Sequence, residues 1–158
     1  MTCAALPAWG MDNLSVISYS DATSEQKQAV FKIVESDDSL KIYRHTLNHP
    51  NTDFKKDILL SGDTAKGAAL YTDSQIDDKK VRTINALVID AASRWQGYGR
   101  HLMQKTQEDA HQLGIERILL QARSNAIQFY TAIGFKPDFD SDLPYLPMYK
   151  DLKPSKSV

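Results

Sequence analysis

A glycine-containing loop between an apolar strand pattern and an amphipathic helix pattern is the feature that most restricts the fold of this chain. The strand pattern is INALVID over residues 84–90, the helix pattern covers 98–113, and the loop contains Gly97 and Gly99. A second apolar strand pattern, ERILLQAR over 116–123, follows the helix. A strand, a helix and a second strand in this order predict a right-handed crossover between parallel strands. The chain is therefore expected to be an α/β protein.

The loop has the composition of an anion-binding site. A glycine destabilises a helix by about 0.5–1 kcal/mol relative to alanine, so two glycines at a helix start indicate that side chains there would obstruct a ligand. The first amide groups of a helix lack partners within it and attract anions, and Arg94 and Arg100 add positive charge. The loop matches neither a P-loop nor a dinucleotide-binding fingerprint, because their Lys-Ser/Thr pair and third glycine are missing. We expect a phosphate or pyrophosphate group to bind here.

The remaining segments alternate between strand and helix patterns. We predict strands at 14–20, 55–62, 67–73 and 81–90, a helix that begins at Thr23 or Ser24, a weaker helix at 39–50, and a short helix at 124–135 with Ser124 as its cap. Turns that contain Gly and Asp favour an antiparallel front half. Three prolines within 136–152 place any strand of that segment at an edge, or interrupt it.

Two motifs resemble the GNAT superfamily of N-acetyltransferases. The first is the R-x-x-G-x-G loop from Arg94 to Gly99, and the second is the strand and helix RILLQARSNAIQFYTAIGF at 117–135. The resemblance covers about residues 80–136. It implies the GNAT fold, an α/β (α+β) arrangement with a mixed central sheet of about six to seven strands. In that fold the front half is antiparallel, a parallel pair is splayed at the cofactor site, and about four helices flank the sheet.

The resemblance also implies a binding site for acetyl-CoA as the acyl donor. Backbone groups of Leu87, Val88 and Ile89 would pair with its pantetheine arm, and Asn125 would contact the pantetheine region. Tyr130 would lie near the thioester sulfur and protonate the departing CoA thiolate. The loop would hold the pyrophosphate through backbone amides of Arg94, Trp95, Gln96, Gly97, Tyr98, Gly99 and Arg100.

The activity implied by the resemblance is acetyl transfer to a primary amine of a small molecule, a protein N-terminus or a lysine, by direct attack in a ternary complex. Some relatives carry a catalytic glutamate where this chain has about Thr83, which cannot accept a proton. Ordered water and an amine that arrives neutral are both open routes for that proton. Two other interpretations also stay open: a non-catalytic acyl-CoA-binding or sensing module, and an acyltransferase for a different acyl-CoA.

Composition restricts the partners and the compartment. A net charge of -1 over 158 residues provides no basic excess for nucleic-acid binding. No segment approaches the ~20 apolar residues of a membrane span. The single cysteine, Cys3, fits a reducing compartment, so we expect a cytoplasmic protein. We further expect one domain over 1–158 with residues 1–12 as a loose leader in which Met11 is a candidate start. The resemblance to the GNAT superfamily leaves a homodimer through the last strand open, because that strand of the fold often serves in dimer contacts.

The histidines do not predict a metal site. His45 and His49 have the spacing of one helical face, but Asp53 is the only close carboxylate and no cysteine is nearby. His101 and His111 are expected at the surface of the crossover helix. We therefore expect no metal ion in this protein.

Overall fold

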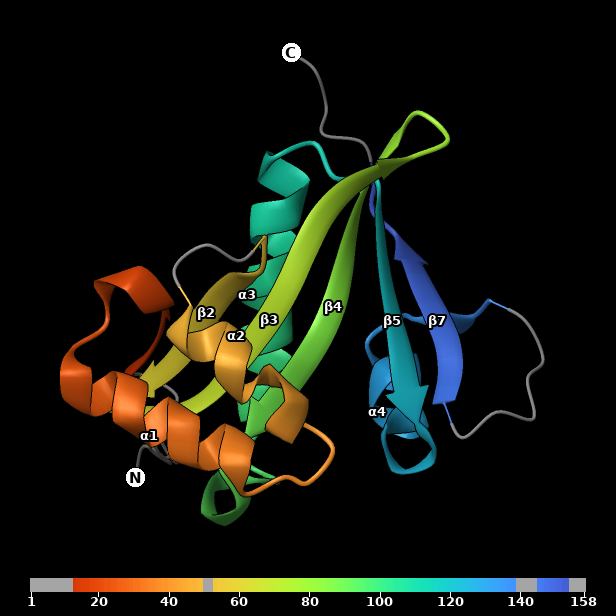
Figure 1. Cartoon of the computed structure of the whole chain (residues 1–158). Coiled ribbons are helices and arrows are strands. Elements are labelled where there is room, and N and C mark those ends of the chain that lie inside the picture. The colour runs from red at the N-terminus through yellow and green to blue at the C-terminus, as the bar shows by residue number, and fades with distance from the viewer. Residues whose placement is uncertain (1–12, 50–52, 139–144, 154–158) are drawn as a thin grey trace, which may run out of the picture.

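The computed structural model describes residues 13–49, 53–138 and 145–153, which form a seven-stranded sheet with helices on both faces (Figure 1). The strands lie in the order β1-β2-β3-β4-β5-β7-β6. They are β1 Leu14–Ser18, β2 Lys55–Ser61, β3 Thr64–Ile76, β4 Lys79–Ile89, β5 Arg117–Arg123, β6 Lys136–Pro137 and β7 Tyr145–Asp151. The α-helices are α1 Ser24–Glu35, α2 Arg44–Asn48, α3 Tyr98–Gln112 and α4 Ile127–Ala132. The predicted mixed sheet and its flanking helices are confirmed, whereas the leader predicted at 1–12 lies outside the described residues.

β1 to β4 form an antiparallel meander, as the turn residues predicted. Gly62 lies between β2 and β3 with a φ of 60°, and Asp77 and Asp78 lie between β3 and β4 with φ of 49° and 65°. Glycine and, less readily, aspartate adopt this left-handed conformation. β3 is longer than predicted, because residues 74–76 continue the ladder with β4 beyond the apolar core. Their exposed side chains carry no apolar pattern from which the extension could be inferred.

β4 and β5 are parallel neighbours for only a short distance. The ladder joins Val81–Ile84 to Arg117–Leu120 and goes no further. β4 continues to Ile89 and β5 to Arg123, and the two strands diverge (Figure 1). A bulge at Asn85, which has no partner in the ladder with β3, lies where the divergence starts. The splayed parallel pair expected from the resemblance is therefore confirmed.

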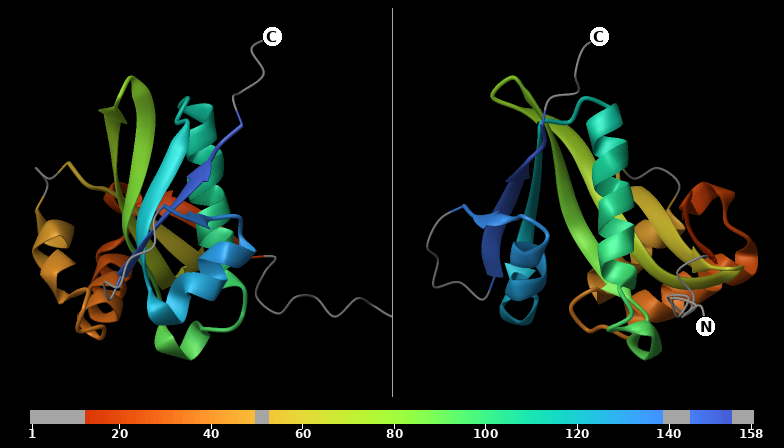
Figure 2. Two further views of the ribbon diagram at one scale, coloured as in Figure 1. Left: turned by 90° about the vertical axis from the view of Figure 1, so that its right-hand side faces the viewer. Right: turned by 180° about the vertical axis from the view of Figure 1, so that it is seen from behind.

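The helices cover the two faces of the sheet in pairs. α1 and α2 lie on one face, and α3 and α4 lie on the other (Figure 2). Val30, Ile33 and Val34 of α1 pack against the apolar side chains of β2, β3 and β4. Leu102 and Met103 of α3, both fully buried, belong to the cluster on the opposite face. Full burial of such a side chain contributes about 1.5–3 kcal/mol, so the cores on the two faces together stabilise β2, β3 and β4, which contribute side chains to both.

Local signals position the helix ends. Thr23 caps α1 in a capping box: the Gln26 N–H donates to the Thr23 hydroxyl oxygen at 3.1 Å, and the Gln26 side-chain oxygen accepts from the Thr23 N–H at 2.9 Å. α3 ends where Gly114 adopts a φ of 76°. The predicted helix at 124–135 was partly wrong, because a 3₁₀ turn at Ser124–Ala126 precedes α4. Ser124 therefore does not cap α4. The weak helix at 39–50 likewise consists of a 3₁₀ turn followed by α2.

The edge position or interruption predicted from the prolines is only partly found, because β7 is continuous and lies between β5 and the short β6. β7 pairs with β5 along its whole length, but with the two-residue β6 only through Met148 and Tyr149. Pro147 lies next to that short contact. Proline has no N–H to donate to a ladder, which agrees with the position of Pro147 where the pairing with β6 ends.

Candidate functional site

Among the described strands, none pairs with the β5-facing edge of β4 beyond the splay. Residues 87–89 pair with β3 on one side, whereas the ladder with β5 stops at Ile84. The side chains of Leu87 and Ile89 pack in the α3-side core, and Val88 is buried on the α1 side. Only the backbone groups on the β5 side of this segment are left without a strand partner. An extended ligand that carries amide groups can pair with them as an added strand does.

The start of α3 has free amide groups. Gly97 is the N-cap with a φ of 81°, and no described side chain caps this helix. The first bond within the helix runs from the His101 N–H to the Gly97 carbonyl at 3.1 Å, so the amides of Tyr98, Gly99 and Arg100 precede it. Within the described first turn of α3 no residue is acidic, and the positive end of the helix dipole is therefore unopposed. The start of α1, by contrast, is closed by its capping box.

The loop before α3 presents exposed polar and aromatic side chains. The Arg94 Nε donates to the Ile89 carbonyl at 3.3 Å, which ties the loop to the end of β4. Arg94, Gln96 and Arg100 are exposed. Trp95 has a φ of 67° and is 101% exposed. A left-handed backbone costs a residue with a side chain roughly 1–2 kcal/mol, so this loop is locally strained.

Gly97 and Gly99 have different reasons to be glycine. Gly97 supplies a left-handed backbone, whereas Gly99 does not have a positive φ. A Cβ on Gly99 would lie 3.4 Å from the Phe129 ring and 3.7 Å from the Ile89 side chain. The start of α3, the end of β4 and α4 therefore meet at Gly99. The side chain of Tyr98 is buried in the core on the α3 side of the sheet, so only the backbone of that residue is available to a ligand.

Tyr130 of α4 lies among aromatic rings. Its ring makes edge-to-face contacts with Phe129 and Phe135, with centroids 5.1 and 5.7 Å away. Burial raises the pKa of the Tyr130 phenol to about 12, and the positive charge of Arg123 partly opposes this rise. The phenol is therefore protonated near neutral pH and can donate a proton. Asn125 is exposed in the 3₁₀ turn between β5 and α4.

Comparison with known proteins agrees with this geometry. Residues 19–151 match the sequence model of the acetyltransferase (GNAT) domain. The chain belongs to the GNAT family. No curated protein matches the chain in sequence.

Solved structures share the GNAT fold with this chain at low sequence identity. An aminoglycoside 6'-N-acetyltransferase complexed with coenzyme A is 14% identical over 90% of this chain and 99% of its own, with a TM-score of 0.71. The ribosomal-protein-S18-alanine N-acetyltransferase from Escherichia coli is 15% identical over 92% and 98%, with a TM-score of 0.65. AtaTR bound with AcCoA is 19% identical over 89% and 94%, with a TM-score of 0.66. Identities this low establish the fold alone.

An ion pair connects the two parts of this GNAT domain that separate where β4 and β5 diverge: the part with β4 and α1, and the part with β5. The Arg123 Nη2, at the end of β5, lies 3.4 Å from the Asp37 Oδ1, which follows α1. The same oxygen accepts from the Ser39 N–H at 3.1 Å and from the Ser39 hydroxyl at 2.6 Å. Burial disfavours the Asp37 anion, but the Ser39 hydrogen bonds and the Arg123 charge together hold the pKa of that carboxyl below its ordinary value. Sequence reasoning missed both partners, because the 86 residues between them leave no local pattern.

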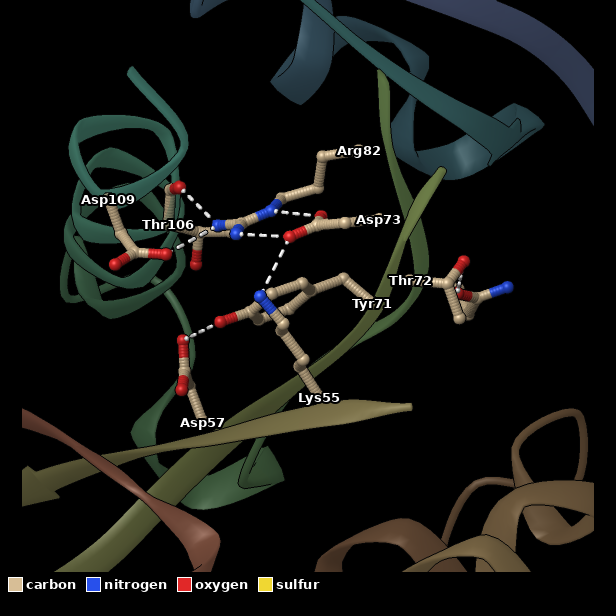
Figure 3. Close-up of polar contacts among 9 residues, drawn as sticks. Lys55, Asp57, Tyr71, Thr72, Asp73, Arg82, Thr106 and Asp109 are labelled. Carbon is tan, nitrogen blue, oxygen red and sulfur yellow. Dashed lines mark hydrogen bonds and ion pairs between the residues drawn. The ribbon is translucent and has the colours of Figure 1, made fainter. Parts of the chain in front are cut away.

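A buried ion network holds α3 of the GNAT domain against the sheet (Figure 3). Arg82 of β4 is 0% exposed, and its Nε and Nη2 donate to the Asp73 carboxylate at 2.7 and 2.9 Å. Its Nη1 donates to the Asp109 carboxylate at 2.9 Å and to the Thr106 carbonyl at 3.0 Å, both on α3. The guanidinium also stacks on the Tyr71 ring, 4.0 Å from the centroid. No local sequence pattern indicated this role of Arg82.

Two further titratable groups border the network. The Tyr71 hydroxyl donates to the Asp57 carboxylate at 2.9 Å, and the Lys55 ammonium bonds to Asp73 at 2.9 Å (Figure 3). Burial raises the pKa of Asp57, although the hydrogen bond from Tyr71 opposes the rise. Burial also raises the pKa of the Tyr71 phenol, and the Asp57 charge adds to that effect. These two bonds join β2 to β3 beside the Arg82 network.

Thr83, the position predicted to lack a proton acceptor, lies close to the point of divergence. It pairs with Leu119 of β5 and Thr72 of β3, one residue before the parallel ladder ends. A hydroxyl at this point can donate or accept a hydrogen bond but is not basic near neutral pH. The structure thus places the expected base position beside the open edge of β4 with a residue unsuited to that role.

Other expectations concern histidines and membranes. Among residues 13–49, 53–138 and 145–153, no three His, Cys, Asp or Glu side chains are grouped to hold a metal ion. The rings of His45 and His49 have centroids 6.5 Å apart. The surface prediction for His101 was partly wrong, since its Nε2 is buried with no hydrogen-bond partner in the described part of the chain. No helix within these residues is long and apolar enough to cross a membrane.

Proposed function

We propose that this chain is an acetyl-CoA-dependent N-acetyltransferase that acts on a primary amine of a small molecule, a protein N-terminus or a lysine. One observation supports the proposal most directly: the open β4 edge at 87–89 is followed along the chain by the uncapped amides of Tyr98, Gly99 and Arg100. An extended arm with amide groups fits the first, and a diphosphate fits the second. CoA has these two parts in the same covalent order, because its pantetheine arm carries amide groups and is attached to a diphosphate.

The surrounding residues have supporting roles in this proposal. Arg94 and Arg100 add positive charge next to the diphosphate, and the backbone from Trp95 to Gly97 completes the loop around it. Asn125 contacts the pantetheine region from the turn after β5. The positive φ of Gly97 lets the backbone turn its amide groups toward the anion.

The chemistry requires one bond to form and one to break. The amine nitrogen attacks the thioester carbonyl carbon, and the tetrahedral intermediate then releases the sulfur with the electron pair of the C–S bond. The Tyr130 phenol donates its proton to that sulfur, a contribution of about 10²–10⁴ in rate. Backbone N–H groups on the open edge of β4 stabilise the developing oxyanion.

The amine must also lose a proton. Thr83 cannot accept it, so water takes the proton or the amine arrives neutral. In both cases the rate follows the fraction of neutral amine. We therefore expect kcat/KM to rise with pH up to the pKa of the acceptor amine and to show no additional ionisation of a protein carboxylate.

The test combines CoA binding by calorimetry with thiol release across a panel of amines. The panel includes an aminoglycoside and a peptide with an N-terminal alanine, because the names of two structural neighbours point to these different acceptors. We expect CoA binding and amine-dependent thiol release from acetyl-CoA. Binding without transfer to any amine would favour an acyl-CoA sensing module. Faster transfer from a longer acyl-CoA would favour a different donor.

A further inference from the structure

Trp95 is anomalous in this structure. Its side chain is 101% exposed, the highest value among the exposed large apolar residues of the described chain. Its φ of 67° lies in the left-handed region, which bulky residues rarely adopt. The other described non-glycine residues with positive φ are Asp77 and Asp78, and both lie in the β3–β4 turn, where aspartate tolerates this conformation.

The exposed indole of Trp95 and its left-handed backbone do not stabilise the fold. An indole that is fully in solvent buries no apolar surface, so it does not offset the strain of its own backbone. Such strain persists where the surroundings impose it and is frequent at ligand clamps. The surroundings here are the hydrogen bond from Arg94 to the Ile89 carbonyl on one side and the left-handed Gly97 on the other. The loop therefore holds the indole outward in a defined place.

The neighbours of the indole indicate what can cover it. Arg94, Gln96 and Arg100 are exposed beside it in the sequence, so the aromatic ring is surrounded by polar and cationic groups. The other exposed large apolar residues of the described chain lie away from the loop, and Leu113 among them lies at the opposite end of α3: Ile42, Ile76, Leu113 and Tyr145. A single ring among cations is a poor protein-docking patch, which normally covers several hundred Å². It is well suited to an anionic ligand that carries a flat aromatic group.

We infer that the Trp95 indole stacks on the adenine ring of the bound acyl-CoA. This inference rests on the proposed function, because a diphosphate on the amides of Tyr98 to Arg100 places the adenosine one ribose away, at the rim of the loop. Arg94 and Arg100 complement the charge of the ribose phosphate. Stacking of a base on an aromatic side chain contributes about 1–3 kcal/mol, which corresponds to about 5- to 150-fold in affinity.

The test uses Trp95→Gly, which removes the indole and relieves the left-handed backbone at once. We expect Trp95→Gly to keep or raise the melting temperature and to weaken CoA binding by about 5- to 150-fold. The KM for acetyl-pantetheine, which has no nucleotide, is expected to stay unchanged. Trp95→Tyr keeps a stacking ring and should retain most of the affinity. Trp95→Asn, which also tolerates a left-handed backbone, serves if the glycine variant does not fold.

Fluorescence offers a readout that does not depend on activity. Trp9 and Trp95 are the two tryptophans, so a Trp9→Phe protein reports on Trp95 alone. We expect CoA to quench its emission and 4′-phosphopantetheine to leave it unchanged.

Three results would overturn the inference while leaving the proposed function intact. They are wild-type CoA affinity in Trp95→Gly, an equal loss for CoA and acetyl-pantetheine, and a change of oligomeric state without a change in CoA affinity. The last would show that a second copy of the chain covers the indole. Failure of the wild-type protein to bind any acyl-CoA would instead refute the proposed function itself.

Discussion

The guanidinium of Arg123 lies 3.4 Å from the carboxylate of Asp37, although 86 residues separate them in the chain. Asp37 follows α1, which packs over β2, β3 and β4, and Arg123 is the last residue of β5. The pair therefore connects the two arms that diverge at the splay. The charge of Arg123 also acts on the phenol of Tyr130, so one side chain links the α1–α2 side of the sheet to the proposed acid.

Replacement of Arg123 is expected to impair the acid more than the fold. Arg123→Gln removes the charge that lowers the pKa of Tyr130, so the phenol becomes a weaker acid and kcat falls, whereas Arg123→Lys restores part of the rate. Because both partners are partly exposed, a double-mutant cycle with Asp37→Asn should give a coupling energy of at most about 1 kcal/mol in urea unfolding. An unchanged kcat for Arg123→Gln would show that the charge of Arg123 does not assist proton donation by Tyr130.

The same pair predicts a pH dependence of stability. The pKa of Asp37 is lowered in the folded protein, so its anion adds stability above its ordinary value of 3.8, and this stability is lost as pH falls further. We expect wild type to exceed Asp37→Asn in unfolding free energy at neutral pH, and the difference to shrink below about pH 4. A difference that is independent of pH would contradict ionisation of Asp37 as its source.

Tyr130→Phe tests the proposed acid. We expect kcat to fall by about 10²-fold or more and the Kd for CoA to stay unchanged, because the ring keeps its contacts with Phe129 and Phe135. The raised pKa of Tyr130 also means that the unfolded chain loses its proton first. Wild type should therefore lose stability between about pH 10 and 12 relative to the variant, measured by urea unfolding. Equal kcat values across the pH range would assign the proton donor to solvent.

Gly97→Ala and Gly62→Ala form a matched pair. Both glycines have a positive φ, of 81° and 60°, so each alanine should cost about 1–2 kcal/mol of unfolding free energy. Gly62 lies in the β2–β3 turn with open space around it, whereas Gly97 caps α3. Only Gly97→Ala is expected to weaken CoA binding, by about tenfold or more in calorimetry. Equal stability losses with unchanged CoA affinity in both variants would show that Gly97 serves only the backbone turn and not CoA binding.

Arg82→Met is expected to destabilise the protein by about 3 kcal/mol, measured by denaturant unfolding. The substitution leaves the Asp73 carboxylate without its bidentate partner and the Thr106 carbonyl without its donor. Asp109→Asn, which alters the half-exposed end of the network, should cost about 1 kcal/mol or less. A smaller loss in Arg82→Met than in Asp109→Asn would show that α3 is held mainly by its apolar face.

Several features of the site were predictable because their signals are local. The apolar pattern at 84–90, the loop glycines and the amphipathic helix that ends at Gly114 involve neighbours within a few residues. The prediction for Ser124 failed because a 3₁₀ turn and an α-helix use nearly the same backbone region, so a capping residue alone does not distinguish them. The close approach of Phe129, which explains why residue 99 is a glycine, could be found only from the structure, because Phe129 lies 30 residues further along the chain.

The sequence by itself determined the order of strands and helices, and the strand, loop and helix start at which we propose that a diphosphate binds. These depend on periodicity, capping and backbone sterics, which act over a few residues. Only the tertiary structure decided where β4 and β5 part, that Arg82 fastens α3 to the sheet, and that Arg123 meets Asp37. Such contacts depend on sheet order and on which faces pack together, and their partners are separated by too many residues for any local pattern to record them.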